Sequence, residues 1–323
     1  MKFKKTFRNS IIKGLILLFL CALLIFPDSS LEGASKGLLL WFHNVLPSLL
    51  PFIILSNLLI HLNITEQISK VFYPIFGRLF RISSQGCYPI IIGFLSGIPI
   101  GAKATADMVS ENKISLKEGH FLLGICNIVS PMFIFGYIAI TQLKLPSAKY
   151  ILLIIIYGAS ILGTVLYRLL FLRQKNDFVH NSSAYGPDKS TPSHFSFSLL
   201  DDSIMNGFEI VTRIGGYIIL FSILAQIIKE IGPDTSFIKA FIMGILEITT
   251  GISQICTTSL DNATKIVLVS VITSFGGISG IAQTKSVLGN TRLSINAYVI
   301  IKIFSAAFAF LFAMIYVSML SIR

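Results

Sequence analysis

Charged side chains are scarce in this chain of 323 residues. Lys, Arg, Asp and Glu together make up 13% of it, whereas soluble globular domains carry about a quarter. Hydrophobic residues make up 54%, and the mean hydropathy is +0.79. These values exclude an ordinary soluble domain and indicate an all-α polytopic membrane protein, because helices satisfy their own backbone groups in lipid.

Paired cysteines and catalytic groupings are missing too. The four cysteines are isolated, so no CxxC spacing of a metal or redox site exists. No serine or cysteine has a paired base at motif spacing, and His43, His61 and His120 are scattered near the ends of apolar segments. We therefore expect no catalytic residues, no metal and no cofactor, and an integral membrane enzyme ranks third among the functions considered.

Acidic residues are outnumbered, and the net charge is +11. In a soluble protein this excess would suggest a nucleic-acid partner. Here the basic residues lie between apolar segments, where they act as topology signals. We expect no nucleic-acid binding.

Long apolar runs dominate what is present. A spanning helix needs about 20 mostly apolar residues, and on that criterion the sequence predicts about seven spans: 11–27, 38–61, 119–143, 150–172, 203–231, 264–288 and 295–320. The basic segment 1–13 predicts a cytoplasmic N-terminus. No small-residue cleavage site follows the run 14–26, so we expect a retained first helix.

Two further segments, 86–110 and 237–256, are too interrupted to be ordinary spans. The first contains Gly93, Gly97, Pro99 and Gly101. Irregular backbone is tolerated at membrane depth only where it is buried in protein or lines a cavity. Each segment is therefore predicted to be a re-entrant hairpin.

The chain divides into two similar parts. The predicted first membrane repeat, 1–172, places hairpin 86–110 before a span broken at 127–131; the second, 203–323, places hairpin 237–256 before a span broken at 276–280. With a cytoplasmic N-terminus, the order of the predicted spans puts the two hairpins on opposite sides of the membrane. This is an inverted repeat, a common plan of secondary transporters. The polar stretch 173–202 is predicted to be a disordered cytoplasmic linker, and 64–81 a helix in the cytoplasmic interface.

Two pairs of opposite charges fall at membrane depth. Lys103 and Asp107 stand four residues apart where the first hairpin returns, and Glu209 and Arg213 repeat that spacing in the fifth span. Intramembrane charges are functional by default, although such a pair can simply neutralise itself. We favour a substrate role for Lys103 and an ion or proton role for Asp107, and leave both interpretations open for Glu209 and Arg213.

Glu247 lies in the second hairpin with no basic residue within a turn. It must protonate, bind a cation or face water. It is the strongest single candidate for a coupling-ion or proton site.

Neutral polar residues and glycines gather at the predicted helix breaks. They could also hold helices together, but freed N–H groups at half-helix starts attract anions. With Lys103, the predicted substrate-binding set is Ser96, Gly97, Gly101, Asn127, Ser130, Thr249, Thr250, Gly276, Gly277, Ser279 and Gln283.

Four sequence blocks carry a resemblance to a known family. They are Leu46 to Phe52, Phe94 to Lys103, Cys126 to Ile134 and Ser274 to Gln283. Together they resemble the sporulation integral membrane protein YlbJ family, whose paired nucleoside-recognition Gate domains are similar in plan to concentrative nucleoside transporters. Ile98, Ile128 and Val129 differ from the family pattern.

The resemblance implies transport of a small anionic metabolite, dipicolinate, across the outer forespore membrane toward the forespore. A proton- or sodium-coupled nucleoside transporter is the first alternative, and a non-transporting scaffold of sporulation the second. The expected partners are the small-molecule substrate, membrane lipid, and either a second copy of the chain or another sporulation membrane protein.

Overall fold

The computed structural model describes residues 2–62, 64–172, 195–230 and 237–321. Every regular element in these ranges is helical. The chain begins with α1 (Lys2–Ile25), α2 (Pro27–Leu40), the π-helical turn η1 (Trp41–Val45), α3 (Leu46–His61) and α4 (Ile64–Phe80). The all-α prediction is confirmed, and α4 matches the helix predicted over 64–81.

The first hairpin and a broken helix follow. The hairpin consists of α5 (Cys87–Ser96) and α6 (Ile100–Ser110), and the next elements are α7 (Leu116–Cys126), the π-helix η2 (Phe133–Gln142), the short 3-10 helix η3 (Pro146–Ala148) and α8 (Lys149–Phe171). The hairpin breaks at residues 97–99, and the helix that follows it breaks at residues 127–130. Both breaks fall where glycine, proline and asparagine predict them.

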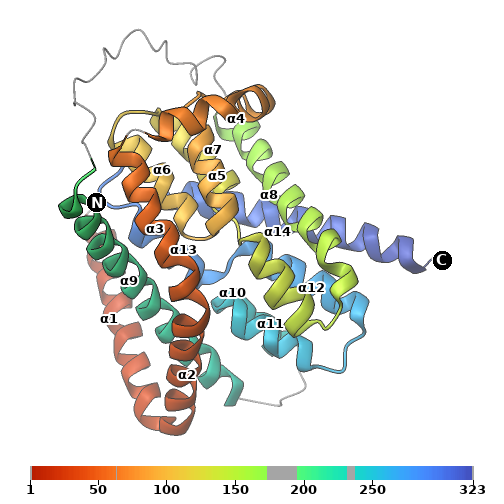
Figure 1. The fold of residues 1–323 in the computed structure, drawn as a ribbon. Coiled ribbons are helices and arrows are strands. Elements are labelled where there is room, and N and C mark those ends of the chain that lie inside the picture. Colours follow the sequence, from red (N-terminus) through yellow and green to blue (C-terminus); the bar gives the residue numbers. More distant parts are fainter. Residues whose placement is uncertain (1, 63, 173–194, 231–236, 322–323) are drawn as a thin grey trace.

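The second part repeats this order. Its elements are α9 (Phe197–Glu230), the hairpin helices α10 (Phe237–Leu246) and α11 (Ile248–Thr257), the broken pair α12 (Asn262–Phe275) and α13 (Gly277–Val287), and α14 (Ile295–Ser321). In Figure 1 the α5–α6 hairpin lies in the upper half and the α10–α11 hairpin in the lower half, with α12 beside α11. The two hairpins thus enter the fold from opposite ends.

The number of spans differs from the predicted seven. Among the residues that the structure describes, four helical stretches are long and apolar enough to cross a membrane, or five if the bent pair Ile16–Ile25 and Pro27–His43 is one span. That pair turns by 107° at Phe26, where Pro27 cannot continue α1 and instead starts α2. The count of seven is therefore not confirmed, because several expected spans are built from shorter pieces.

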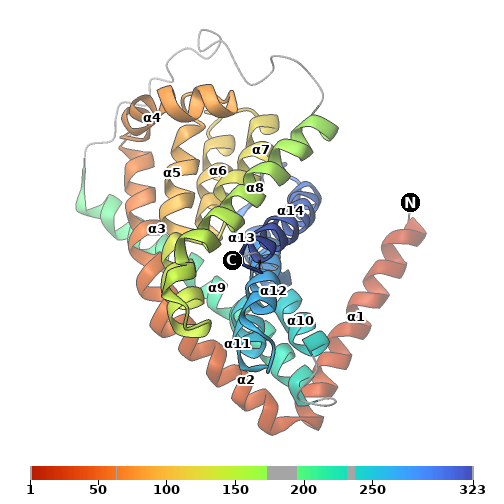
Figure 2. The same cartoon turned by 90° about the vertical axis from the view of Figure 1, so that its right-hand side faces the viewer.

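Residues 28–37, which the sequence leaves between the predicted spans 11–27 and 38–61, form most of helix α2. Small residues make it possible: Gly33 and Gly37 lie against the backbone of Ile223 and Ile219 on α9. α2 consequently packs along α9 over most of its length, as Figure 2 shows.

The predicted linker 173–202 also needs a new boundary. Residues 173–194, with His180 and His194, lie outside the described ranges. Phe197 and the residues after it, up to Asp202, already belong to α9. The predicted linker therefore overlaps the start of α9 at residues 197–202.

Glycines let the arms of each hairpin touch. A methyl group added at Gly93 or at Gly101 would lie 1.9 Å from the Cys126 carbonyl oxygen, so both arms press on the end of α7. In the second hairpin a methyl group at Gly251 would lie 2.0 Å from Gly244 Cα. The same device, two glycines facing each other, closes both hairpins.

Gly215 and Gly216 provide an internal comparison of packing. α9 runs unbroken through both, and Gly215 makes room for Trp41, whose indole nitrogen donates to the Val211 carbonyl at 2.8 Å. Gly215→Ala should lower the free energy of unfolding by about 1–3 kcal/mol, because the added methyl group would meet the indole ring at 2.6 Å. Gly216→Ala should not destabilise, since nothing lies within 4 Å of its added methyl group. Thermal unfolding in detergent measures both, and equal losses would contradict this packing.

Candidate functional site

The break between α12 and α13 is the meeting point of the fold. Gly276 and Gly277 both have positive φ, 85° and 70°, a conformation that glycine adopts without strain. A methyl group at Gly276 would lie 3.6 Å from Ile98 Cδ1, and one at Gly277 would lie 3.1 Å from Ile248 Cγ2. Ile98 is the tip of the first hairpin and Ile248 follows the tip of the second. Both tips therefore rest on this one break.

The first tip is fixed to the broken end of α7. Gly97, with φ 81°, lies against the Ser130 backbone nitrogen, and the Ser130 hydroxyl accepts from the Phe133 N–H at 3.3 Å. Ser96 is buried and its hydroxyl has no described hydrogen-bond partner. The tip thus offers an unused polar group next to a helix start.

The second tip is organised by Glu247. Its side chain, 3% exposed, caps the start of α11 by accepting from the Thr250 N–H at 2.7 Å, from the Thr250 hydroxyl at 2.9 Å and from the Thr249 hydroxyl. All three bonds end on Oε2, and none found among the described residues ends on Oε1. A carboxylate at a helix N-terminus is favourable, which explains how Glu247 is held without a basic neighbour.

A cavity of about 850 Å³ lies at the two tips. We call it the hairpin-tip cavity. Its walls come from the end of α2, η1, α3, both hairpin tips, the break before η2 and most of η2, α9, and α13. The Tyr137 hydroxyl on the η2 side donates to the Thr249 carbonyl at 2.7 Å and so ties that wall to the second tip. Apart from Glu247 and His43, its described lining carries no ionisable side chain other than tyrosine.

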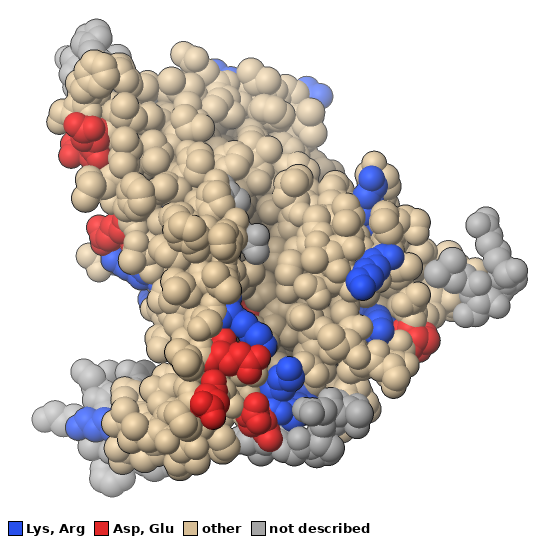
Figure 3. Space-filling model, turned by 60° about the horizontal axis from the view of Figure 1, so that its bottom comes forward, with Lys and Arg blue, Asp and Glu red and all other residues tan. Residues whose placement is uncertain are grey.

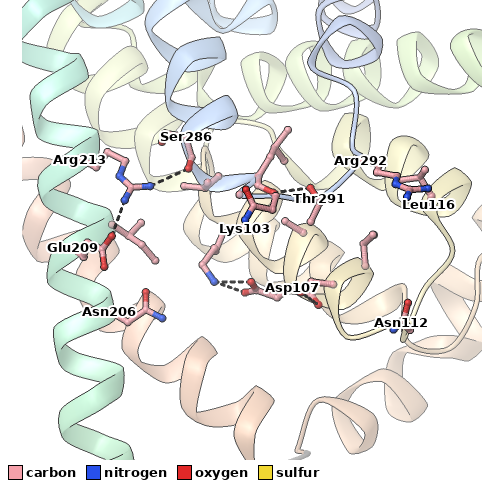
Figure 4. Close-up of a pocket in the computed structure, with 18 residues that line it drawn as sticks. Lys103, Asp107, Asn112, Leu116, Asn206, Glu209, Arg213, Ser286, Thr291 and Arg292 are labelled. Carbon is pink, nitrogen blue, oxygen red and sulfur yellow. Dashed lines mark hydrogen bonds and ion pairs between the residues drawn. The ribbon is translucent and has the colours of Figure 1, made fainter.

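A second cavity, about 660 Å³, lies between α6, α9 and the end of α13 (Figure 4). We call it the lysine cavity. Lys103 donates to both oxygens of Asp107 at 2.7 and 2.6 Å, and Arg213 donates to Glu209 at 2.7 Å and to the Ser286 carbonyl at 3.2 Å. Arg292 also lines it. Three cations against two carboxylates give its described lining a net charge of +1.

Charges are otherwise sparse. Figure 3 shows acidic and basic side chains gathered in a few groups on a surface that is mostly uncharged. The lysine cavity is therefore a local concentration of charge.

The exposed Asp261, at the start of α12 and outside both cavities, accepts hydrogen bonds from Thr264, and these lower the pKa of its carboxyl group.

The two cavities share no lining residue, yet three structural elements reach both. The first hairpin gives Ile98 to one and Lys103 to the other, and α13 gives Gln283 and Ser286. Helix α9 contributes Ile218 and Arg213 in the same way. The first hairpin, α9 and α13 therefore border both cavities.

The predicted site residues separate into three groups. Those lining the hairpin-tip cavity are Ser96, Ser130, Glu247, Thr249, Gly276 and Gln283. Lys103 and Asp107 line the lysine cavity. The others lie at or behind the breaks and line neither cavity: Gly97, Gly101, Asn127, Thr250, Gly277 and Ser279. Lys103 and Glu247 are thus placed in different cavities.

Sequence reasoning missed several residues of this region. Lys302 falls in the predicted span 295–320 and is not among the predicted site residues, but it is 1% exposed and its amine lies near Gly276. Tyr298 lies beneath it, and Tyr298 donates to the Asn127 carbonyl at 3.4 Å. The available signal was the position of Lys302 within the apolar stretch 295–320, where a charge is costly.

Substitutions of Lys103 and of its ion-pair partner Asp107 should affect transport differently. If Lys103 binds substrate, Lys103→Gln should reduce transport at least about tenfold at normal abundance, since one charge-assisted hydrogen bond contributes about 1.5–3 kcal/mol. Asp107→Asn keeps the cation and should retain much more transport. Uptake into vesicles, normalised to protein amount, measures both. Equal losses of abundance in the two variants would identify a purely structural ion pair.

Comparison with known proteins identifies similar sequences for this chain. The Gate family model, described as nucleoside recognition, matches residues 42–166, which contain the first hairpin and the broken α7–η2 helix. The chain is 27% identical to the sporulation integral membrane protein YlbJ of Bacillus subtilis (strain 168), over 95% of this chain and 82% of that protein. No solved structure matches. The resemblance identified in the four sequence blocks is confirmed.

Proposed function

We propose that this chain is a sporulation transporter that moves a small anionic metabolite, dipicolinate, across the outer forespore membrane toward the forespore. One observation carries the proposal: both hairpin tips rest on the α12–α13 break, with a cavity at the tips and a second cavity alongside. The similarity to YlbJ supports the sporulation context.

The arrangement fits the way secondary transporters work. Their substrates bind between discontinuous helices near the middle of the fold, and one repeat moves against the other. Here the first hairpin, α9 and α13 each reach both cavities. Substrate would pass between the hairpin-tip cavity and the lysine cavity as these elements shift.

The net positive charge of the lysine cavity favours an anionic substrate. Lys103, Arg213 and Arg292 outnumber the carboxylates of the lysine cavity. At the breaks, α6 begins at Ile100 and α13 at Gly277, and the free N–H groups at helix starts attract negative charge. A planar dicarboxylate suits this combination of cations and helix starts.

A nucleoside is the second candidate. The description of the Gate family favours it, and so does the neutral lining of the hairpin-tip cavity, which includes Ser130, Thr249 and Gln283. In that case Glu247 would hold the coupling proton or sodium ion.

Purified protein in vesicles separates the candidates. We expect uptake of radiolabelled dipicolinate above that of empty vesicles, with uridine unable to compete. Saturable uptake of uridine instead would favour the nucleoside transporter. Uptake of neither, with or without a sodium or pH gradient, would contradict transport and leave the scaffold role.

A further inference from the structure

Lys302 has an unusual position for a charged side chain. It lies in α14, is 1% exposed, and its Nζ has no hydrogen-bond partner among the described atoms. None of the ion pairs found in the described ranges includes it. Its Nζ lies over the ring of Tyr298, 5.5 Å from the ring centroid.

These contacts cannot compensate for burial of the charge. A cation over an aromatic ring gains up to about 2 kcal/mol, whereas taking a charge out of water costs several kcal/mol. The carboxyl end of α12 lies nearby, and its dipole adds at most about 1 kcal/mol for a cation. An acid group bound next to Nζ would supply the missing partner.

The amine lies directly behind the meeting point of the hairpins. A methyl group at Gly276 would be 3.3 Å from Lys302 Cε and 3.7 Å from Nζ. Gly276 itself lines the hairpin-tip cavity. The amine thus lies close to a residue of the cavity wall that has no side chain.

Other buried polar atoms at the helix breaks also lack a described hydrogen-bond partner. Asn127 Oδ1, Ser274 Oγ and Ser96 Oγ are buried without a described partner. Asn127 is linked to α13 by its amide, which donates to the Thr284 hydroxyl at 2.8 Å. The breaks thus hold a group of buried donors and acceptors whose hydrogen bonds are incomplete.

We propose that Lys302 binds a carboxylate of the transported molecule when the tip of the first hairpin moves off Gly276. This inference rests on the proposed function and names the group that recognises the acid. Lys103 differs, because its charge is already paired with Asp107. Lys302 is the buried cation that a ligand can neutralise.

The test compares ligand binding and stability in the same variants. Purified wild type, Lys302→Met and Lys302→Gln are melted in nanodiscs with pyridine-2,6-dicarboxylate, with its diamide, or with uridine. Lys285→Met is the matched control, since Lys285 is exposed and lines neither cavity.

We expect the dicarboxylate, but not the diamide, to raise the melting temperature of wild type and of Lys285→Met. The Lys302 variants should bind the dicarboxylate at least about tenfold more weakly, equivalent to about 1.4 kcal/mol. Without ligand, Lys302→Met should melt higher than wild type, because it removes an unpaired buried amine.

Three results would overturn the inference. Equal dicarboxylate affinity in wild type and the Lys302 variants would remove Lys302 from the site while leaving anion transport intact. Failure of both Lys302 variants to fold would assign the residue a structural role. Absence of any dicarboxylate effect on wild type would instead contradict the proposed function itself.

Discussion

Cross-linking the first hairpin tip to α13 should stop transport, and reducing the cross-link should restore it. The pair is Ile98→Cys with Gly280→Cys in a background without native cysteines. A methyl group at Gly280 would lie 4.0 Å from Ile98 Cγ2, and both residues line the hairpin-tip cavity. Since substrate must pass the tip, a covalent bond here should reduce uptake to the level of empty vesicles.

Each single cysteine variant is the control for this experiment. Both should transport normally under oxidising and reducing conditions. Full transport by the oxidised double variant, with the cross-link shown by mass spectrometry, would mean that the tip does not need to leave α13.

Replacing Glu247 with glutamine should abolish accumulation driven by a pH gradient while sparing exchange. The amide introduced by Glu247→Gln would mimic the protonated carboxyl group, and its oxygen could still accept the bonds from Thr250 that start α11. Substrate should therefore bind and exchange in counterflow. With a pH gradient across the same vesicles, uptake should stop at equal substrate concentrations inside and outside.

Asp261→Asn is the matched control for Glu247→Gln. Asp261 caps α12 as Glu247 caps α11, by accepting from the N–H and hydroxyl of the threonine three residues later. It lines neither cavity. Its variant should keep gradient-driven uptake. If Glu247→Gln also keeps it, Glu247 is a helix cap and nothing more.

Local sequence was sufficient to predict the breaks. Gly97 and Pro99 follow the end of α5, Asn127 follows the end of α7, and Gly276 separates α12 from α13. Glycine and proline weaken helical backbone, although α9 runs unbroken through Gly215 and Gly216. The hairpin arms were predictable for the same reason.

Long-range packing was not predictable in this way. The sequence does not reveal that Gly33 and Gly37 fit α9, so it predicts a connection where α2 lies. The sequence also does not reveal which neighbouring helices or cavities a given side chain faces. Lys302 faces the α12–α13 break, and Lys103 and Glu247 face different cavities, only because of how distant helices pack.

The central claim is that one site between the hairpin tips is reached from both sides of the membrane. Thiol labelling with a membrane-impermeant reagent tests it most directly. Reference cysteines at Ser110, the last residue of the first hairpin, and at Ser259, shortly after the second, should react from opposite faces. A single cysteine at Ile98 should react from one face without substrate and from the other face when dipicolinate is added. Labelling of Ile98→Cys from a single face in both conditions, or of the two reference cysteines from the same face, would contradict the account.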